Sequence, residues 1–588
     1  MDGKPDRWRL YRLALREAAL AARGSLARGA SWLRVGTPAP DRLLFAPQDL
    51  RTADPTVASD IYAGFFVFSG RAITTGGRSP FDYEPPTRAW GEAFYGFGWL
   101  RHLRAAGTAL AHANARSLVD EFMALGNGGH PLARETHVTA RRLISFISQS
   151  PLILDGADHA FYQRFLKAIG RHVRDLERAL RSEPLPYRRL TASVALCYAG
   201  LCCEGLEGSL QRATRLLARD LDRQVLPDGG HASRNPRILI DLLFDLLPLR
   251  QMYASREVDT PAELLNAIDR MLPMVRLFRH GDGTLSHFNG MGVTAADHLA
   301  TLLTYDDMRS RAIHHAPHSG YERLEAGRSL VVADVGPVPD LALSAEAGAG
   351  CLSFEFSSGP TRIIVNCGLP RHASEAVSEA ARTTPAHSTA TLDGASSCRF
   401  LAVGGLWLER LVAQWLLRRL GPVALDGPRE VRAERGERDQ VLMLDASHDG
   451  YLRRFGVTHE RRWRLSAQGQ RLEGEDLFRS DGPSAATTAE IRFHLAPGIR
   501  ASRAQGGRVV MLVLPNREAW QFEASLAEAW LEDSVYFAAT EGPRRSEQIV
   551  LKVPLGETPS VRWRFERLAR GSEEAAAQRQ AEPAPELL

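Results

Sequence analysis

Apolar side chains recur every three or four positions through the first half of the chain. Between residues 161 and 180 they mark one face of a helix: Phe161, Phe165, Leu166, Ile169, Val173, Leu176 and Leu180. Thr260-Pro261-Ala262-Glu263 predicts another helix start, with a capping box and proline at the first helical position, and its end before Gly281 is left open by Pro273. Successive amphipathic helices bury their faces against one another, which predicts a bundle, a solenoid or a closed toroid over about residues 90–320.

From about residue 328 the period of the apolar positions changes to two. Leu352, Phe354 and Phe356 alternate with polar residues, and residues 491–495 and 561–565 repeat this pattern. Such alternation is typical of half-buried antiparallel strands, and many of them together predict a β-sandwich. One segment differs, because residues 407–420 have the pattern of a helix.

The length and charge of the chain restrict its class. A chain of 588 residues predicts two or more domains, and 44% hydrophobic with 24% charged residues is typical of a folded protein. The net charge of +4 is too small to indicate a nucleic-acid partner, although a basic groove for an acidic sugar stays possible. We expect a basic amphipathic segment over 1–45, a helical domain over 46–327, a sandwich over 328–568 and a disordered tail over 569–588.

The cysteines and the N-terminal segment indicate in which cellular compartment the protein is expected. None of the six cysteines forms a CxxC pair, which favours buried free thiols and a reducing compartment. Arginines interrupt every apolar stretch of residues 1–40, so no signal peptide is expected and a cytoplasmic location follows. Leu10, Leu13 and Leu15 with Arg9, Arg12 and Arg16 form a basic amphipathic pattern, either for a peripheral contact with an anionic membrane or for a helix packed on its own domain.

Several short motifs, in a fixed order, carry a family resemblance. They are Asp228-Gly229-Gly230-His231 with Arg234-Asn235-Pro236, Cys351-Leu352-Ser353-Phe354-Glu355, Ile364-Val365-Asn366-Cys367-Gly368, Arg382-Thr383-Thr384-Pro385-Ala386-His387-Ser388-Thr389 and His448-Asp449-Gly450-Tyr451. Together they resemble the heparinase II/III-like polysaccharide lyases, often periplasmic proteins. The resemblance implies an incomplete α/α toroid followed by a large antiparallel β-sandwich.

The same resemblance implies β-elimination on a uronate-containing polysaccharide or oligosaccharide, the work of a carbon–oxygen lyase. One group must neutralise the sugar carboxylate, a base must remove the C5 proton, and an acid must protonate the leaving oxygen at C4. His231, Asn235, His387 and Glu346 are the candidates for these catalytic roles. In an alternative interpretation, Asp228 and Asn235 only serve turns and helix capping.

Further residues are candidates for substrate contacts: His287, Asn289, Arg371, Arg382 and Tyr451. Phe288 stands where the lyases carry a catalytic tyrosine. The family's His-x-His-x-Asp stretch is Glu346-Ala347-Gly348-Ala349-Gly350 here, and its later aspartate is Asn366, so no family-type zinc site and no other cofactor is expected.

Two hypotheses therefore stand beside each other. The first is a lyase that cleaves an acidic glycan. The second is a catalytically inactive carbohydrate-binding or envelope-associated protein that keeps the lyase fold, since a fold does not determine an activity.

Overall fold

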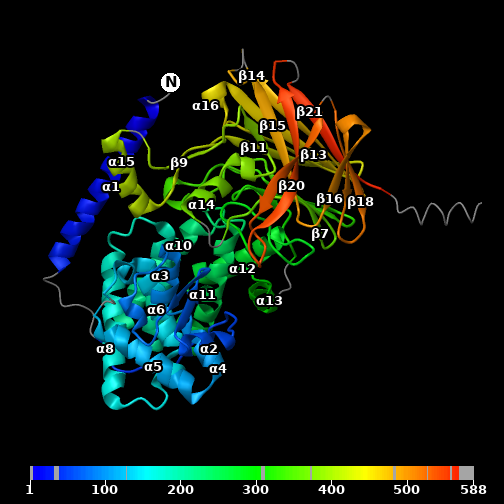
Figure 1. Ribbon diagram of the computed structural model, residues 1–588. Helices are drawn as coiled ribbons and strands as arrows, with labels where there is room; N and C mark the ends of the chain where they lie inside the picture. The colour runs from blue at the N-terminus through cyan, green and yellow to red at the C-terminus, as the bar shows by residue number, and fades with distance from the viewer. Residues whose placement is uncertain are drawn as a thin grey trace, which may run out of the picture.

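The chain forms a helical domain followed by two stacked antiparallel sheets, which confirms the predicted fold class (Figure 1). The computed structural model describes residues 4–31, 39–126, 129–305, 311–370, 374–404, 406–480, 482, 485–525, 527–556 and 559–568. The predicted disordered tail over 569–588 lies outside the described residues.

The helical domain is an open ring of helices, in which α9 packs on both α6 and α10. All seven apolar residues of the stripe predicted over 161–180 are buried, most of them on α8, and α9 behind it is buried on nearly every side. A short hairpin, β1 (Phe65–Phe68) and β2 (Arg71–Thr74), covers one end. The helices are α2 (Thr56–Tyr62), α3 (Arg88–Tyr95), α4 (Leu100–Ala106), α5 (Ala109–Ala124), α6 (Thr136–Ser148), α7 (Ser150–Leu154), α8 (His159–Ala179), α9 (Pro186–Cys202), α10 (Glu207–Gln224), α11 (Pro236–Ser255), α12 (Ala262–Phe278) and α13 (Ala296–Thr304).

The start of α12 differs from the prediction. The helix begins at Ala262, so Pro261 takes the N-cap position and the capping box expected from Thr260 does not form. A proline side chain accepts no hydrogen bond, and Thr260 lies one residue too early to cap. The helix continues through Pro273 to Phe278.

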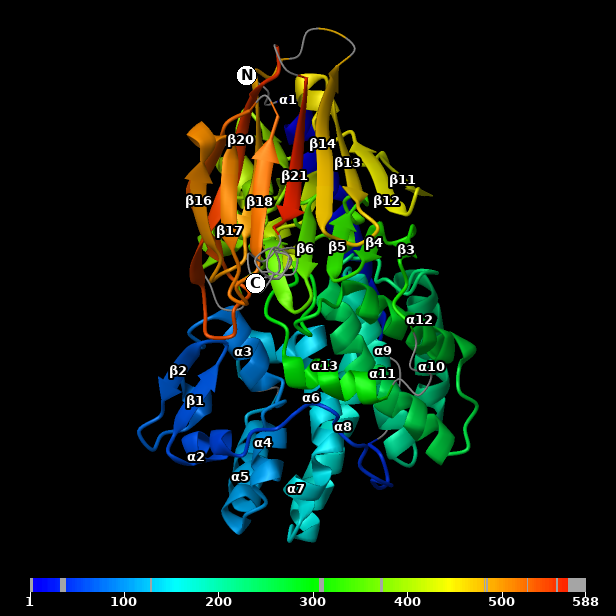
Figure 2. The same cartoon turned by 90° about the vertical axis from the view of Figure 1, so that its right-hand side faces the viewer.

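Two antiparallel sheets stack to form the second domain, and Figure 2 shows the first of them above the helical ring. The eight-stranded sheet has the order β11 (Val431–Arg438), β12 (Val441–His448), β13 (Val457–Leu465), β14 (Arg471–Ser480), β21 (Ser560–Arg567), β18 (Ala519–Ala524), β17 (Val509–Val513) and β16 (Arg500–Ala504). The second sheet has the order β19 (Ala529–Tyr536), β20 (Arg544–Pro554), β15 (Thr488–Leu495), β7 (Thr361–Val365), β6 (Phe354–Ser358), β5 (Ser329–Asp334), β4 (Tyr321–Ala326) and β3 (His315–Ala316), with β8 (Ala390–Leu392) paired to β15.

The second sheet begins earlier than the boundary expected at residue 328. Its first strands, β3 and β4, precede that boundary. The four consecutive residues of β4 from Tyr321 to Leu324 are all buried. Tyr321 packs in the core of the helical domain and Leu324 in the core between the sheets. A strand buried on both faces shows no period of two, so the pattern did not reveal it.

A buried ion pair ties the two sheets together. Arg461 on β13 donates Nε to Asp476 on β14 at 2.7 Å, and its Nη1 donates to the carbonyl oxygens of Leu352 and Ser388, which belong to the opposite layer. His459 and Trp563 also bind the Asp476 carboxylate. Both charged side chains are fully buried, so each depends on the other for its solvation.

The N-terminal helix α1 (Lys4–Ser31) packs on α15 (Trp407–Leu420), the helix predicted over 407–420, and not on the helical domain that follows it (Figure 1). Leu13 lies among Leu416 and Leu420, and Glu17 pairs with Arg419 at 2.8 Å. Among the described residues, no helix is both long and apolar enough to cross a membrane.

The Arg461 pair gives a first prediction. Asp476→Asn leaves the buried guanidinium without a counter-charge, and we expect the free energy of unfolding to fall by about 3–5 kcal/mol. Asp445→Asn is the matched control, because Asp445 pairs with Arg464 on the surface, where such a pair contributes about 0–1 kcal/mol. Urea denaturation measures both values, and similar losses for the two variants would contradict the interpretation.

The same carboxylate predicts a pH dependence. Burial by itself would raise the pKa of Asp476, but Arg461 and His459 outweigh it and lower the pKa to about 2. An ordinary aspartate titrates near ~3.9, so this group stabilises the fold above that pH, and the stabilisation is lost as the pH falls toward 2. Acid titration of the melting temperature should show a shallower decline for Asp476→Asn in that window.

Candidate binding site at the domain junction

Arg234 anchors the helical domain to the second sheet. It lies in the loop before α11, and its guanidinium donates to the carbonyl oxygens of Ser319, Gly320, Gly336 and Pro337 and to the carboxylate of Asp334. Tyr321 donates its hydroxyl to the Arg234 carbonyl at 2.5 Å, and its ring lies under the guanidinium. We call Arg234, Asp334, Tyr321 and Asn289 the Arg234 network.

Asn289 belongs to this network rather than to a substrate-binding surface. Its Nδ2 donates to Asp334 at 3.0 Å and to the Tyr321 hydroxyl at 2.8 Å, and its Oδ1 accepts from the backbone N–H of Gly348. The side chain is buried with both ends bonded. The expected substrate contact at Asn289 is therefore corrected to a structural link between the two domains.

Beside the network, one buried side chain, Asn235, meets two partly exposed ones, Arg237 and Glu346. Asn235 caps α11 by accepting from the N–H of Arg237 at 2.9 Å, and its Nδ2 donates to Glu346 at 2.8 Å. The Arg237 guanidinium donates to the other oxygen of Glu346 at 2.5 Å. The side chains of Arg237 and Glu346 are 39% and 41% exposed. We call Asn235, Arg237 and Glu346 the junction site.

Close backbone packing holds the junction site together. A Cβ on Gly290 would lie 2.7 Å from Nδ2 of Asn235 and 2.8 Å from Cβ of Glu346, so only glycine fits here. This glycine follows Asn289 of the Arg234 network. The structure thus brings two predicted residues, Asn235 and Glu346, into contact although 111 positions separate them.

The chemistry of the junction site is that of a carboxylate receptor. An amide N–H and a guanidinium at the start of the long helix α11 donate to one carboxylate, and both groups favour an anion. Glu346 raises the pKa of Arg237 above its usual value, against the effect of burial. Sequence reasoning missed Arg237, because an arginine in the first turn of a helix carries no motif.

His231 does not reach the junction site. It is buried, its Nδ1 accepts from the N–H of Ser233 at 3.1 Å, and its Nε2 faces Gln224 at 3.3 Å. Burial lowers its pKa to about 3. Ser233 also accepts from the N–H of Asn235 through its hydroxyl, so His231 supports the loop that carries Asn235 and is not available to a substrate.

His387 fills the space where the family would place zinc ligands. Its Nδ1 donates to the carbonyl of Thr383 at 2.8 Å, and a Cβ on Gly348 would lie 2.7 Å from its Nε2. A Cβ on Gly350 would meet the same ring at 2.6 Å, and burial lowers the pKa of the imidazole. Asn366 accepts from the N–H of Ser388. Gly348, Gly350, Asn366 and His387 offer one imidazole and no carboxylate, and the carboxylate of Glu346 is bound to Asn235 and Arg237, which does not fit a zinc ion.

Two other predicted contacts are buried structural groups, which corrects both expectations. Arg382 is buried and donates to the carbonyl oxygens of Ser344, Ala347 and Pro422, so its guanidinium is not exposed to a sugar. Tyr451 is buried, and its hydroxyl donates to the carbonyl of Ala390 at 2.7 Å. Arg371 lies outside the described residues.

His287 belongs to a separate buried cluster. Its Nδ1 donates to Glu355 at 3.0 Å, and its Nε2 lies 3.4 Å from the hydroxyl of Tyr536. Arg362 pairs with Glu355 at 2.6 Å, and its charge with that of His287 holds the pKa of this carboxyl low against the effect of burial. Tyr536 comes from β19, 249 positions away, so no local motif could have shown this phenol beside His287.

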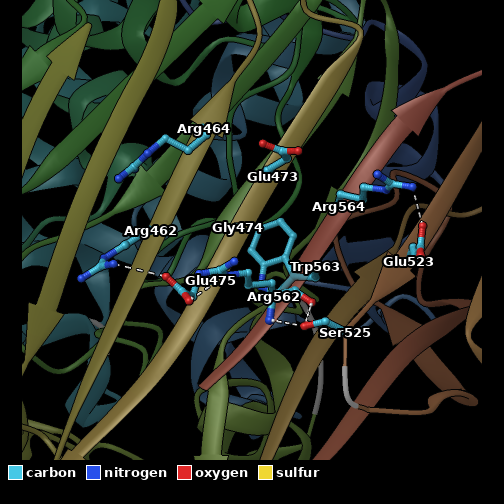
Figure 3. Close-up of a pocket in the computed structure, with 10 residues that line it drawn as sticks. All are labelled: Arg462, Arg464, Glu473, Gly474, Glu475, Glu523, Ser525, Arg562, Trp563 and Arg564. Carbon is cyan, nitrogen blue, oxygen red and sulfur yellow. Dashed lines mark hydrogen bonds and ion pairs between the residues drawn. The ribbon is translucent and has the colours of Figure 1, made fainter. Parts of the chain in front are cut away.

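A hollow on the outer face of the eight-stranded sheet is a weaker candidate (Figure 3). Arginines of β13 and β21 alternate there with glutamates of β14 and β18. Glu475 binds both Arg462 and Arg562, and Glu523 binds Arg564. The charges neutralise one another across neighbouring strands, so this face has no donor set left for an acidic ligand.

Comparison with known proteins identifies the family of this chain. Residues 308–564 match the family described as Heparinase II/III-like, C-terminal. The chain is 32% identical over 555 residues to FtsZ-localized protein C of Caulobacter vibrioides (strain NA1000 / CB15N), a match that covers 91% of this chain and 92% of that protein. The chain belongs to the heparinase II/III-like family.

Solved structures of the family share the fold of this member. A crystal structure of heparinase III superposes with a TM-score of 0.69 at 11% identity, over 96% of this chain and 91% of that one. The heparan sulfate lyase HepC of Pedobacter heparinus gives 0.59 at 12% identity, over 94% and 88%. The toroid and the sandwich are therefore a polysaccharide lyase scaffold, and the family resemblance expected from the motifs is confirmed.

The contact between His387 and the glycine loop gives a prediction. Gly348→Ala adds a methyl group against the imidazole, and overpacking of this kind costs about 1–3 kcal/mol. The double variant Gly348→Ala with His387→Ala should recover part of that loss, since the ring no longer opposes the methyl group. Thermal unfolding of the four proteins in this cycle measures the coupling, and strictly additive losses would show that the ring does not fill this space.

Proposed function

We propose that this protein binds an acidic glycan at the junction site without cleaving it, and that Asn235 and Arg237 receive a carboxylate of the sugar. One observation carries the proposal: these two side chains already hold a carboxylate, that of Glu346, where Arg237 and Glu346 are partly exposed and Asn235 lies buried beneath them. Uronate-containing polysaccharides or oligosaccharides present the same group. Bidentate donation from an arginine and an amide suits it.

The groups around the junction favour binding over β-elimination, which needs a base of suitable pKa next to the C5 proton. Phe288 is buried where the lyases of this type have their tyrosine, and His231 is buried with both nitrogens bonded. Burial raises the pKa of Tyr536 well above its usual value, which makes this phenol a poor base near neutral pH. The β-elimination implied by the family remains a prediction, and Tyr536 with His287 is the pair that would carry it.

In the free protein, the carboxylate of Glu346 occupies the donors of Asn235 and Arg237. An incoming sugar carboxylate must displace the Glu346 carboxylate from Asn235 and Arg237 before it binds. Free protein therefore binds an acidic glycan weakly, and any change that moves Glu346 away strengthens binding. The ligand in this proposal is an oligosaccharide or a biosynthetic intermediate that carries a uronate.

Glu346→Gln tests the receptor directly. The amide competes less well than a carboxylate for the Arg237 guanidinium, so we expect oligomers of a uronic acid to bind at least about fivefold more tightly, the effect of ~1 kcal/mol. Isothermal titration calorimetry with oligogalacturonate, oligoalginate and heparan sulfate fragments measures this. A neutral glucan of similar length is the ligand control and should show no change.

Arg237→Met should abolish that binding, because the remaining amide cannot offset the desolvation of a carboxylate. Arg212→Met is its matched control, since Arg212 also pairs with a glutamate but lies on α10 away from the junction. Equal binding by both arginine variants, or no binding of any uronate by Glu346→Gln, would contradict the proposal.

Absorbance of an unsaturated sugar product separates binding from cleavage. We expect no product from any of these glycans. Product that forms with the natural protein and disappears in Tyr536→Phe would replace our proposal with the lyase function and assign the phenol as the base.

The nearly full-length match to FtsZ-localized protein C favours a second candidate function, association with FtsZ. We propose that the inactive scaffold accompanies FtsZ in the cell. A fluorescent fusion should follow FtsZ in its own host, and a uniform distribution in dividing cells would argue against this role.

A further inference from the structure

A hollow between two helices of the ring is lined by cations. It lies where α5 and α8 pack on each other, away from the sandwich (Figure 1). Its volume is about 430 Å³, within the range of about 300–1,000 Å³ that is typical of small-molecule sites. Four cationic side chains of α8 line it: Arg164, Lys167, Arg171 and Arg174. We call it the α8 hollow.

The rest of the lining is mostly apolar. Met123 and Ala124 at the end of α5 contribute to it, together with Ala39 of the segment that leads into the ring. This segment crosses α8 very closely, because a Cβ on Gly170 would lie 2.8 Å from the Cα of Ala39. Gly170 directly precedes Arg171, so a closely packed wall stands beside the cations.

Two of the cations have no counter-charge. Among the described residues that line the hollow, Asp120 is the only carboxylate, and Arg164 holds it with Nε at 3.1 Å and Nη2 at 3.0 Å. Lys167 and Arg171 belong to no ion pair in the part of the chain that the structure describes. They stand four positions apart on one helix, where like charges repel and destabilise the helix. An anion in the hollow would relieve this repulsion.

The spacing of these two cations favours an anion with more than one charged group. Lys167 and Arg171 are separated by about 6 Å along the helix axis, at ~1.5 Å per residue. They lie on the solvent side of α8, opposite its buried residues Phe165 and Ile169. Linked phosphates can contact both cations at once, and an organic group attached to them would reach the apolar part of the lining.

We propose that the α8 hollow binds a nucleoside di- or triphosphate, with the phosphates against Lys167 and Arg171 and the base against Met123. Lysine and arginine donate charge-assisted hydrogen bonds to phosphate oxygens, and a methionine sulfur packs favourably on an aromatic ring. This inference goes beyond the proposed glycan function, because the hollow shares no residue with the junction site.

Isothermal titration calorimetry of the full chain tests the proposal, with ATP, GTP, pyrophosphate and adenosine at one fixed salt concentration, because salt screens such contacts. We expect saturable binding of both nucleotides, about tenfold weaker binding of pyrophosphate, which has no base to bury, and no binding of adenosine. Pyrophosphate that binds as tightly as ATP, or no binding of either nucleotide, would overturn the proposal.

Substitutions then locate the contact. Lys167→Gln and Arg171→Gln should each lower the affinity for ATP by about tenfold, because each removes a charge-assisted hydrogen bond. Asp120→Asn should raise the affinity by about threefold, because it removes a negative charge beside the phosphates. Arg178→Gln is the matched control, since Arg178 is also on α8 but pairs with Asp175 and does not line the hollow. Equal losses in Arg178→Gln and Arg171→Gln would show only a general attraction to a basic helix and would overturn the assignment.

Competition against ATP identifies the other possible occupants of the α8 hollow. Hexaglutamate represents an acidic protein segment, and oligogalacturonate represents the glycan proposed for the junction site. We expect neither to displace ATP at equal concentration. Displacement by hexaglutamate would show that the hollow receives an acidic peptide, displacement by oligogalacturonate that it receives a glycan, and either result would overturn the nucleotide assignment.

Discussion

The ion pair of Arg234 with Asp334 is the constraint on which the junction depends. A charged arginine this deeply buried needs a counter-charge and acceptors for its remaining N–H groups, and Asp334 and four carbonyl oxygens of the β3–β5 region supply them. The residue after Arg234 is Asn235, so fixing the arginine also fixes the start of α11. Asn289 of the same network accepts a hydrogen bond from the N–H of Gly348, and this bond positions the loop segment that carries Glu346. The two domains are therefore held in one relative position, and this position brings Asn235 and Arg237 next to Glu346.

The pattern of the sequence revealed most of the fold. The helix over 161–180, the strands around 491 and 561 and the helix over 407–420 were visible from their periods, because each buries one face. The strand around 354 was also predicted, although β6 buries both of its faces. Strand β4 was not visible, since it packs against both domains at once and loses its alternation. The capping box at Thr260 failed for a local reason, the position of Pro261, which a residue pattern cannot resolve to one position.

The candidate site was only partly predictable. Asn235 and Glu346 were identified through the family motifs, but their contact with each other depends on Gly290 and on the Arg234 network, both of which are tertiary features. Histidines misled the sequence reasoning, because His231 lies in a glycine-rich motif and His387 in a polar one, and both are nevertheless buried. A histidine in such a motif can equally serve to hold a loop, and only the hydrogen-bond partners distinguish the two cases.

The junction site is also joined to the contact between α1 and α15. Arg382 donates to the carbonyl oxygens of Ser344 and Ala347 on either side of Glu346, and to that of Pro422, two residues after the end of α15. Ala345 packs on the small apolar cluster in which Leu13 of α1 meets Leu416 and Leu420 of α15. The segment that carries Glu346 is therefore held by the chain that follows α15 and by this cluster. Because Glu346 occupies the donors of Asn235 and Arg237, the same contacts keep its carboxylate at the junction site.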